Sequence, residues 1–121
     1  MKKETEDWWK KAQYNLEKAE GNFKMNFFDE TALLCQQSVE VGLKALVIDK
    51  TSSFPKIHDL VQLGKLVGVP EKILELCAKL TPAYIAARYP DSPKDYTKEE
   101  AKKLLVYCKE VLAWIQKNLN F

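Results

Sequence analysis

The chain has 121 residues, of which 46% are hydrophobic and 30% are charged, and its formal net charge at pH 7 is +2. This length suits one domain with one core, and so much apolar material excludes a disordered or low-complexity chain. No apolar run approaches the roughly 20 residues of a membrane span, and charges of both signs are interleaved. We therefore expect a single soluble domain over residues 1–121, located in the cytoplasm and without the basic surface that duplex DNA requires.

The first predicted helix covers about residues 5–24. Its apolar residues recur at alternating spacings of three and four, which is the period of one helix face. They are Trp9, Ala12, Leu16, Ala19 and Phe23. A turn over residues 22–26 is expected to follow, because Gly21 weakens the last helical turn.

The second predicted helix runs from about Asp29 to Lys50 and carries two apolar stripes, so it needs two packing partners. The stripes are Ala32, Cys35, Val39, Leu43 and Leu46, and Leu34, Val41, Ala45 and Ile48. A face of small residues between them allows close approach of a neighbouring helix, and it consists of Ser38, Gly42 and Ala45. Together these faces predict self-association into a homodimer.

The opposite side of this helix is polar and consists of Gln36, Gln37, Glu40 and Lys44. Glu40 and Lys44 form an i,i+4 pair in the favourable order, which is typical of a solvated helix face. Two other interpretations stay open. The polar residues could line a binding cleft, or they could form a buried network that fixes how the helices pack.

Proline and hydroxyl residues divide the second half of the chain. A short third helix is expected over residues 58–66, and a fourth helix over residues 70–87. Pro82 lies inside the fourth segment and predicts a kink, or a restart capped by Thr81. A loop is expected over residues 89–96, because it is rich in proline and polar residues.

The last predicted helix begins with a capping box, in which Thr97 and Glu100 satisfy each other's backbone amides. It extends to about Leu119. No segment alternates with period two, so the predicted class is all-α. We expect an up-and-down bundle of four long helices plus one short helix.

Few residues suggest chemistry. Cys35, Cys77 and Cys108 lack CxxC spacing and histidine neighbours, so we interpret them as buried hydrophobic residues rather than metal ligands. The sequence has no glycine-rich phosphate loop, no nucleophile motif and no Glu-x-x-His pair of a di-iron bundle. No metal and no cofactor are therefore expected.

The only histidine and the only arginine are the candidates that remain. His58 stands beside Asp59 at the start of the third helix, where a histidine usually has a structural role. Arg88 is a single arginine among 18 lysines. Its planar five-donor group suits bidentate binding of a carboxylate or a phosphate, and an ion pair that pins the following loop is the alternative.

These residues resemble the HEPN family of small helical domains over nearly the whole chain. The second helix carries the family's pattern of Gln, Glu and Lys-Ala-Leu at spacings of four, here Gln36, Glu40, Lys44, Ala45 and Leu46. Other matching elements are Trp9-x-x-Ala12 with Leu16 and Ala19, His58-Asp59-Leu60-x-x-Leu63, Tyr84-x-x-x-Arg88-Tyr89-Pro90-Asp91, Tyr96, Ala101 and Trp114.

The resemblance implies a bundle of four or five helices that commonly dimerises and is often encoded beside a minimal nucleotidyltransferase. Such pairs resemble the helical, substrate-binding part and the catalytic part of aminoglycoside nucleotidyltransferases, and some act as toxin and antitoxin. Catalytic members are metal-independent ribonucleases in which four to six residues separate an arginine from a following histidine. Downstream of Arg88 the corresponding positions hold Pro93, Lys94 and Asp95, none of which titrates near neutrality as acid/base cleavage requires.

The favoured hypothesis is a non-catalytic helical partner of a minimal nucleotidyltransferase that contributes to a nucleotide or substrate site. The candidate binding residues are Gln37, Glu40, Lys44, His58, Arg88 and Tyr89. A metal-independent ribonuclease toxin that uses Arg88 and His58 is the first alternative, and a purely structural dimerisation module is the second. Expected partners are a second copy, the nucleotidyltransferase, and a nucleotide or RNA ligand.

Overall fold

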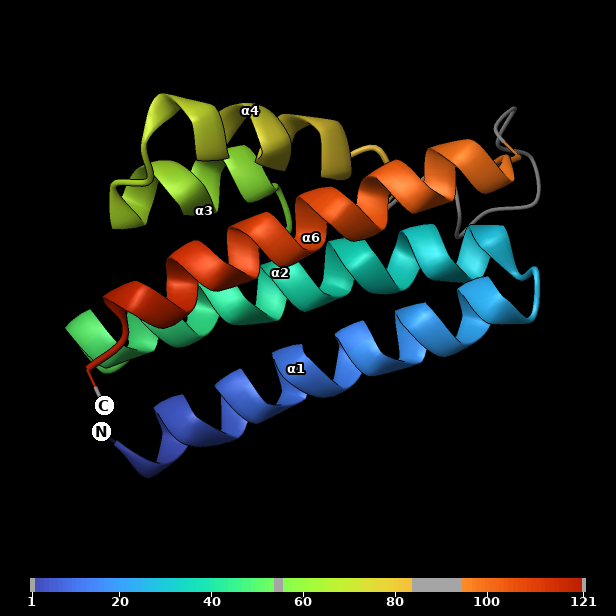
Figure 1. The fold of residues 1–121 in the computed structure, drawn as a ribbon. Coiled ribbons are helices and arrows are strands. Elements are labelled where there is room, and N and C mark those ends of the chain that lie inside the picture. The colour runs from blue at the N-terminus through green and yellow to red at the C-terminus, as the bar shows by residue number, and fades with distance from the viewer. Residues whose placement is uncertain (1, 54–55, 84–94, 121) are drawn as a thin grey trace.

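The computed structural model describes residues 2–53, 56–83 and 95–120, which are mostly helical (Figure 1). The helices are α1 (Lys3–Lys24), α2 (Phe28–Thr51), α3 (Leu60–Val67), α4 (Glu71–Leu80) and α6 (Lys98–Asn118). These described residues contain no strand. The predicted all-α fold is confirmed.

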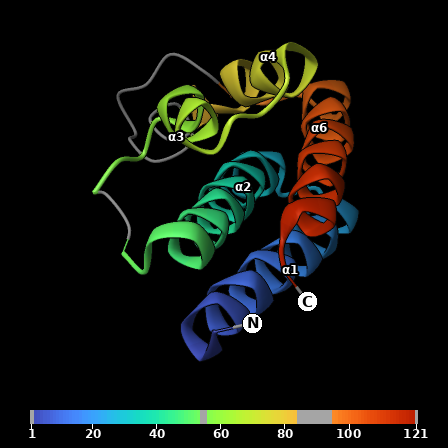
Figure 2. The same ribbon diagram turned by 90° about the vertical axis from the view of Figure 1, so that its left-hand side faces the viewer.

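Helix α2 is the centre of the bundle. It packs mainly against α1 and α6, and α3 and α4 cover a further side of it (Figures 1 and 2). The first apolar stripe of α2 is fully buried, and in the second stripe Ala45 and Ile48 are buried while Leu34 and Val41 are half-buried. Both predicted apolar faces therefore find partners within the chain.

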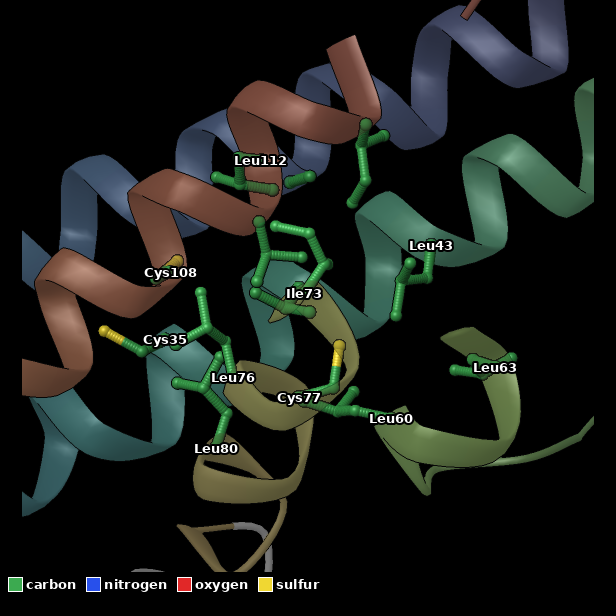
Figure 3. Close-up of a cluster of buried hydrophobic side chains, with 14 of the residues drawn as sticks. Cys35, Leu43, Leu60, Leu63, Ile73, Leu76, Cys77, Leu80, Cys108 and Leu112 are labelled. Carbon is green, nitrogen blue, oxygen red and sulfur yellow. The ribbon is translucent and has the colours of Figure 1, made fainter. Parts of the chain in front are cut away.

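The three cysteines belong to the core, as expected, and all are free thiols. Figure 3 shows Cys35, Cys77 and Cys108 among leucine and isoleucine side chains of the core. Burial, with a smaller effect of the Asp59 carboxylate, raises the pKa of the Cys77 thiol to about 11. This thiol is therefore neutral at pH 7.

The small-residue face of α2 packs inside the chain. A Cβ atom on Gly42 would lie 3.1 Å from a methyl group of Leu112 and 3.1 Å from one of Ile115. The Ser38 hydroxyl donates a hydrogen bond to the Ala12 carbonyl oxygen at 2.7 Å. Helices α1 and α6 thus occupy this face, and it gives no reason to place a second copy there. The homodimer stays a prediction.

Capping residues explain where two helices begin. The Asp59 carboxylate accepts hydrogen bonds from the amides of Val61 and Gln62, so α3 begins at Leu60 rather than at residue 58. The capping box of Thr97 and Glu100 opens α6 as predicted.

The fourth helix is shorter than the sequence pattern indicates. Helix α4 ends at Leu80, and the Thr81 hydroxyl donates to the Cys77 carbonyl oxygen at 2.9 Å. Pro82 lacks an amide proton and its ring opposes a continuous helix, which explains the break. The described residues thus contain three long helices and two short ones. Residues 84–87 of the predicted segment lie outside the described residues, as do Arg88 and Tyr89.

By length and composition alone, α2 could cross a membrane. Its most apolar stretch, however, is 78% buried inside the bundle. Such burial is what a core helix of a soluble protein shows.

Candidate functional site

Glu40 is the centre of a polar cluster on α2. Its Oε1 atom accepts a hydrogen bond from Gln36 Nε2 at 3.0 Å, and its Oε2 atom accepts one from Lys44 Nζ at 2.9 Å. The spacing of four residues places all three side chains on one helix face. Only 11% of the Glu40 side chain and 6% of the Lys44 side chain are exposed. The interpretation as a solvated face is therefore wrong, because neighbouring elements cover the pair.

His58 joins this cluster from the connection between α2 and α3. Its Nδ1 atom lies 2.8 Å from Glu40 Oε2, and its backbone oxygen accepts a weaker hydrogen bond from Gln36 Nε2 at 3.4 Å. The neighbouring Asp59 caps α3, which fixes the position of His58. Because an ionised carboxylate only accepts hydrogen bonds, Nδ1 is the donor in this contact.

Glu40 carries its charge at neutral pH. Burial raises the pKa of its carboxyl group, but hydrogen bonds from Lys44, Gln36 and His58 together more than offset this effect. The net result is a pKa below the ordinary range. The carboxylate and the Lys44 ammonium group consequently form a true ion pair.

A cavity of about 270 Å³ adjoins the cluster between α1 and α2. Its lining consists of Lys11, Asn15, Lys18, Gln37, Glu40, Val41 and His58. A second hollow of about 320 Å³ shares two of these residues and is lined by Asp7, Trp8, Lys11 and Val41. The cluster is therefore both a buried network and part of a cavity wall.

Helix α1 supplies one wall of this cavity, and the sequence pattern did not predict it. Lys11, Asn15 and Lys18 follow one another at spacings of four and three, so they share one face of the helix. Asn15 is 3% exposed, whereas Leu16, which the pattern placed in the core, is half-buried. A polar residue at helical spacing between Ala12 and Ala19, both fully buried, was the available signal.

The structure brings together four of the predicted site residues, namely Gln37, Glu40, Lys44 and His58. Arg88 and Tyr89 lie outside the described residues. Within residues 2–53, 56–83 and 95–120, no group of three or more His, Cys, Asp or Glu side chains could hold a metal ion.

This arrangement has two chemical capacities. Amide and ammonium groups on the cavity wall can donate hydrogen bonds to a ligand. An imidazole whose Nδ1 contacts a carboxylate can also transfer a proton through its second nitrogen, which is the geometry of many general bases.

Comparisons with known proteins agree with the fold. The family model described as HEPN domain matches residues 5–119. The crystal structure of TT1696 from Thermus thermophilus is similar, with a TM-score of 0.88 and 28% identity over 95% of this chain and 98% of that chain. The structure of ST0689, described as an archaeal HEPN homologue, has a TM-score of 0.83 and 26% identity over 99% of this chain and 100% of that chain. No curated protein matches the chain significantly.

Proposed function

This chain belongs to the HEPN domain family, and from that premise we propose that it is a non-catalytic helical partner of a minimal nucleotidyltransferase. In this role it contributes one part of a nucleotide or substrate site. The observation that carries the proposal is the cavity beside Glu40, because its wall combines oriented polar side chains with a buried ion pair.

The ion pair supports a binding role better than a purely structural one. Burying Glu40 and Lys44 removes both charges from water, and apolar residues of similar size would usually stabilise the fold as well or better. The pair stands at a cavity, and it holds His58 and Gln36 in fixed positions. A preorganised polar wall of this kind reduces the entropy that a ligand loses on binding.

A metal-independent ribonuclease is the second candidate function. The contact between His58 Nδ1 and the Glu40 carboxylate favours it, because a carboxylate that orients an imidazole is a frequent arrangement in acid/base catalysis. Against it stands the sequence after Arg88, where the family's catalytic histidine is replaced by Pro93, Lys94 and Asp95. We therefore favour the binding role.

We further propose that the chain and its nucleotidyltransferase act together in the cytoplasm as a toxin–antitoxin pair, of the kind that the family resemblance implies. In this pair the helical chain is a homodimer. Light scattering at micromolar concentration tests the dimer, and a monomer at all accessible concentrations would contradict it.

Co-purification tests the proposed partner directly. The tagged chain is co-expressed with minimal nucleotidyltransferases from the same genome, and complexes are identified by size-exclusion chromatography with light scattering. We expect one of these enzymes to form a stable complex with the chain. If none binds, the proposed function is wrong.

A further inference from the structure

We propose that the outer face of α1 is a docking surface for an acidic amphipathic helix of another protein. The outer face is the side of α1 that holds Tyr14 and Gly21, and Met25 continues it directly after the end of the helix. Spacings of seven and four residues place these three positions on one side. The inference concerns protein binding and does not rest on the nucleotide or substrate site proposed above.

Helix α1 lies at one edge of the bundle (Figures 1 and 2). Its inner side packs against α2 and α6 and contains the fully buried residues Ala12 and Ala19. On the outer face, Gly21 is exposed, and the exposed fractions of Tyr14 and Met25 are 53% and 66%. The part of the chain that the structure describes therefore leaves this face open to a partner.

Exposed apolar side chains gather at this face. Five large hydrophobic side chains of the described residues are exposed, namely Tyr14, Met25, Phe27, Leu66 and Val106. Two of them belong to the outer face, and Phe27 lies in the turn that follows it. Exposed apolar residues that occur singly are common, whereas a group of them marks an interaction surface. Tyrosine is also a residue type that contributes strongly to protein interfaces.

Gly21 indicates that the partner presents a helix. Glycine is unfavourable within a helix, and nothing inside the chain requires it here. Its φ is not positive, and a Cβ atom on Gly21 would meet no neighbouring heavy atom within 4 Å. Gly42, in contrast, is packed closely against α6. The missing side chain of Gly21 leaves the α1 backbone accessible from outside, where a second helix can approach closely.

The charge of the outer face determines the chemistry of that helix. Residues 10–18 contain three lysines, Lys10, Lys11 and Lys18, and one carboxylate, Glu17. The Nζ atoms of Lys11 and Lys18 lie 5.5 and 5.0 Å from the centroid of the Tyr14 ring, so ammonium groups accompany the exposed aromatic ring. Among the described residues, these lysines form no ion pair. The excess positive charge attracts a partner with carboxylates and repels the same face of a second copy.

Two other anionic partners fit these features less well. An anionic membrane also attracts lysine and aromatic side chains, but a fluid lipid layer gains nothing from a helical glycine. Single-stranded RNA also binds surfaces with lysine and aromatic residues. The unbranched thioether side chain of Met25, however, adapts its shape to apolar side chains of a protein partner. We therefore assign the surface to a protein helix with an apolar row flanked by carboxylates.

A titration of the ¹⁵N-labelled full chain with two synthetic helical peptides, followed by NMR, tests the inference. Both peptides carry leucine at helical spacing, and the flanking residues are glutamate in one and lysine in the other. We expect saturable shifts of the Gly21 and Met25 backbone amides with the glutamate peptide, and an affinity at least tenfold lower for the lysine peptide. The surface of Val106 with Lys102 and Lys103 on α6 is the internal comparison, because it is also apolar and basic but has no glycine. Its amides should shift much less.

Gly21→Leu gives the decisive comparison. This variant should bind the glutamate peptide at least tenfold more weakly, because its side chain occupies the space of the partner's backbone, although leucine favours helix. Tyr14→Ala should weaken binding about tenfold, because it removes the exposed aromatic ring. Gln13→Leu is the matched control, since Gln13 is an exposed residue of the same helix that lines the groove between α1 and α6. It should change the affinity by less than about twofold. Circular dichroism establishes that each variant folds.

Four results of the peptide titrations would overturn the inference: no saturable binding of the glutamate peptide, equal affinity for the two peptides, unchanged or higher affinity in Gly21→Leu, or equally large shifts around Val106. Vesicles of phosphatidylcholine with phosphatidylglycerol and a single-stranded oligoribonucleotide are titrated in parallel. Tighter binding of either probe than of the glutamate peptide to the outer face would also overturn it. No nucleotidyltransferase takes part in these titrations, so their outcome is independent of the proposed function.

Discussion

The Nδ1 atom of His58 lies 2.8 Å from the Oε2 atom of Glu40, although 18 positions separate the two residues in the chain. The His58 side chain is 54% exposed, whereas the Glu40 side chain is 11% exposed. The contact therefore links the interior of the bundle to the surface of the cavity. It joins the polar face of α2 and the connection to α3 into a single site.

The buried ion pair should be sensitive to loss of either charge. Glu40→Gln leaves the Lys44 ammonium group, 6% exposed, beside a neutral amide, and we expect this to destabilise the fold by about 3 kcal/mol. Lys44→Met should act similarly, and the double variant should recover part of the loss. Urea denaturation measures the free energy of unfolding of all three variants.

Asp7→Asn is the control, because it removes the exposed Lys3–Asp7 pair and should leave the stability nearly unchanged. A similarly small effect of Glu40→Gln would contradict a buried ion pair.

Stability should also depend on pH through Glu40. The folded-state pKa of this carboxyl group lies below its ordinary value of 4.5, so the group stabilises the fold above that value. The contribution is lost as the pH falls from about 5 through the folded-state pKa. Urea denaturation between pH 7 and pH 3 should show a shallower loss of stability for Glu40→Gln than for the original chain. Parallel curves would mean that Glu40 has the same pKa in both states.

Replacement of two helical glycines by leucine should change the stability of the fold in opposite directions. Gly42→Leu should destabilise the fold by about 1 to 3 kcal/mol, because the methyl groups of Leu112 and Ile115 already lie 3.1 Å from the position of a Cβ atom. Gly21→Leu should stabilise it by about 0.5 to 1 kcal/mol, because the space around Gly21 is open and leucine favours helix. Thermal or urea denaturation compares the two variants. Equal effects would contradict the packing of α2 against α6.

Local sequence rules predicted the helices well. The capping box at Thr97 and the break near Pro82 depend on residues next to one another, so one sequence contains the information. The same rules could not place the polar face of α2. An i,i+4 pair such as Glu40 and Lys44 has the same spacing on a solvated and on a buried face, and only tertiary packing distinguishes the two.

The site was predicted in part for the same reason. His58 and Glu40 were both candidates, but their contact depends on how the connection folds back on α2. Asn15 was overlooked because the helical period around it was read from its apolar neighbours, and a single polar residue did not interrupt that period. The wall from α1 therefore became visible only in three dimensions.

A cleavage assay separates the binding role from the ribonuclease alternative. We expect the purified chain to leave single-stranded RNA intact in the presence of EDTA, because no group that titrates near neutrality follows Arg88 at the family's spacing. The assay includes His58→Ala and Arg88→Ala, with Lys10→Gln as a surface control. Cleavage that disappears in the first two variants but persists in the control would establish the ribonuclease.

The affinity of the nucleotidyltransferase complex for nucleotide is the measurement that tests the central claim most directly. Calorimetry compares the original chain with Gln37→Ala, on the cavity wall, and with Gln13→Ala, an exposed glutamine of α1 outside that wall. The account predicts that Gln37→Ala raises the dissociation constant about fivefold, since it removes a hydrogen-bonding group, and that Gln13→Ala leaves it unchanged. Identical constants for all three complexes, or a complex that binds no nucleotide, would contradict the assignment of this cavity as the binding site.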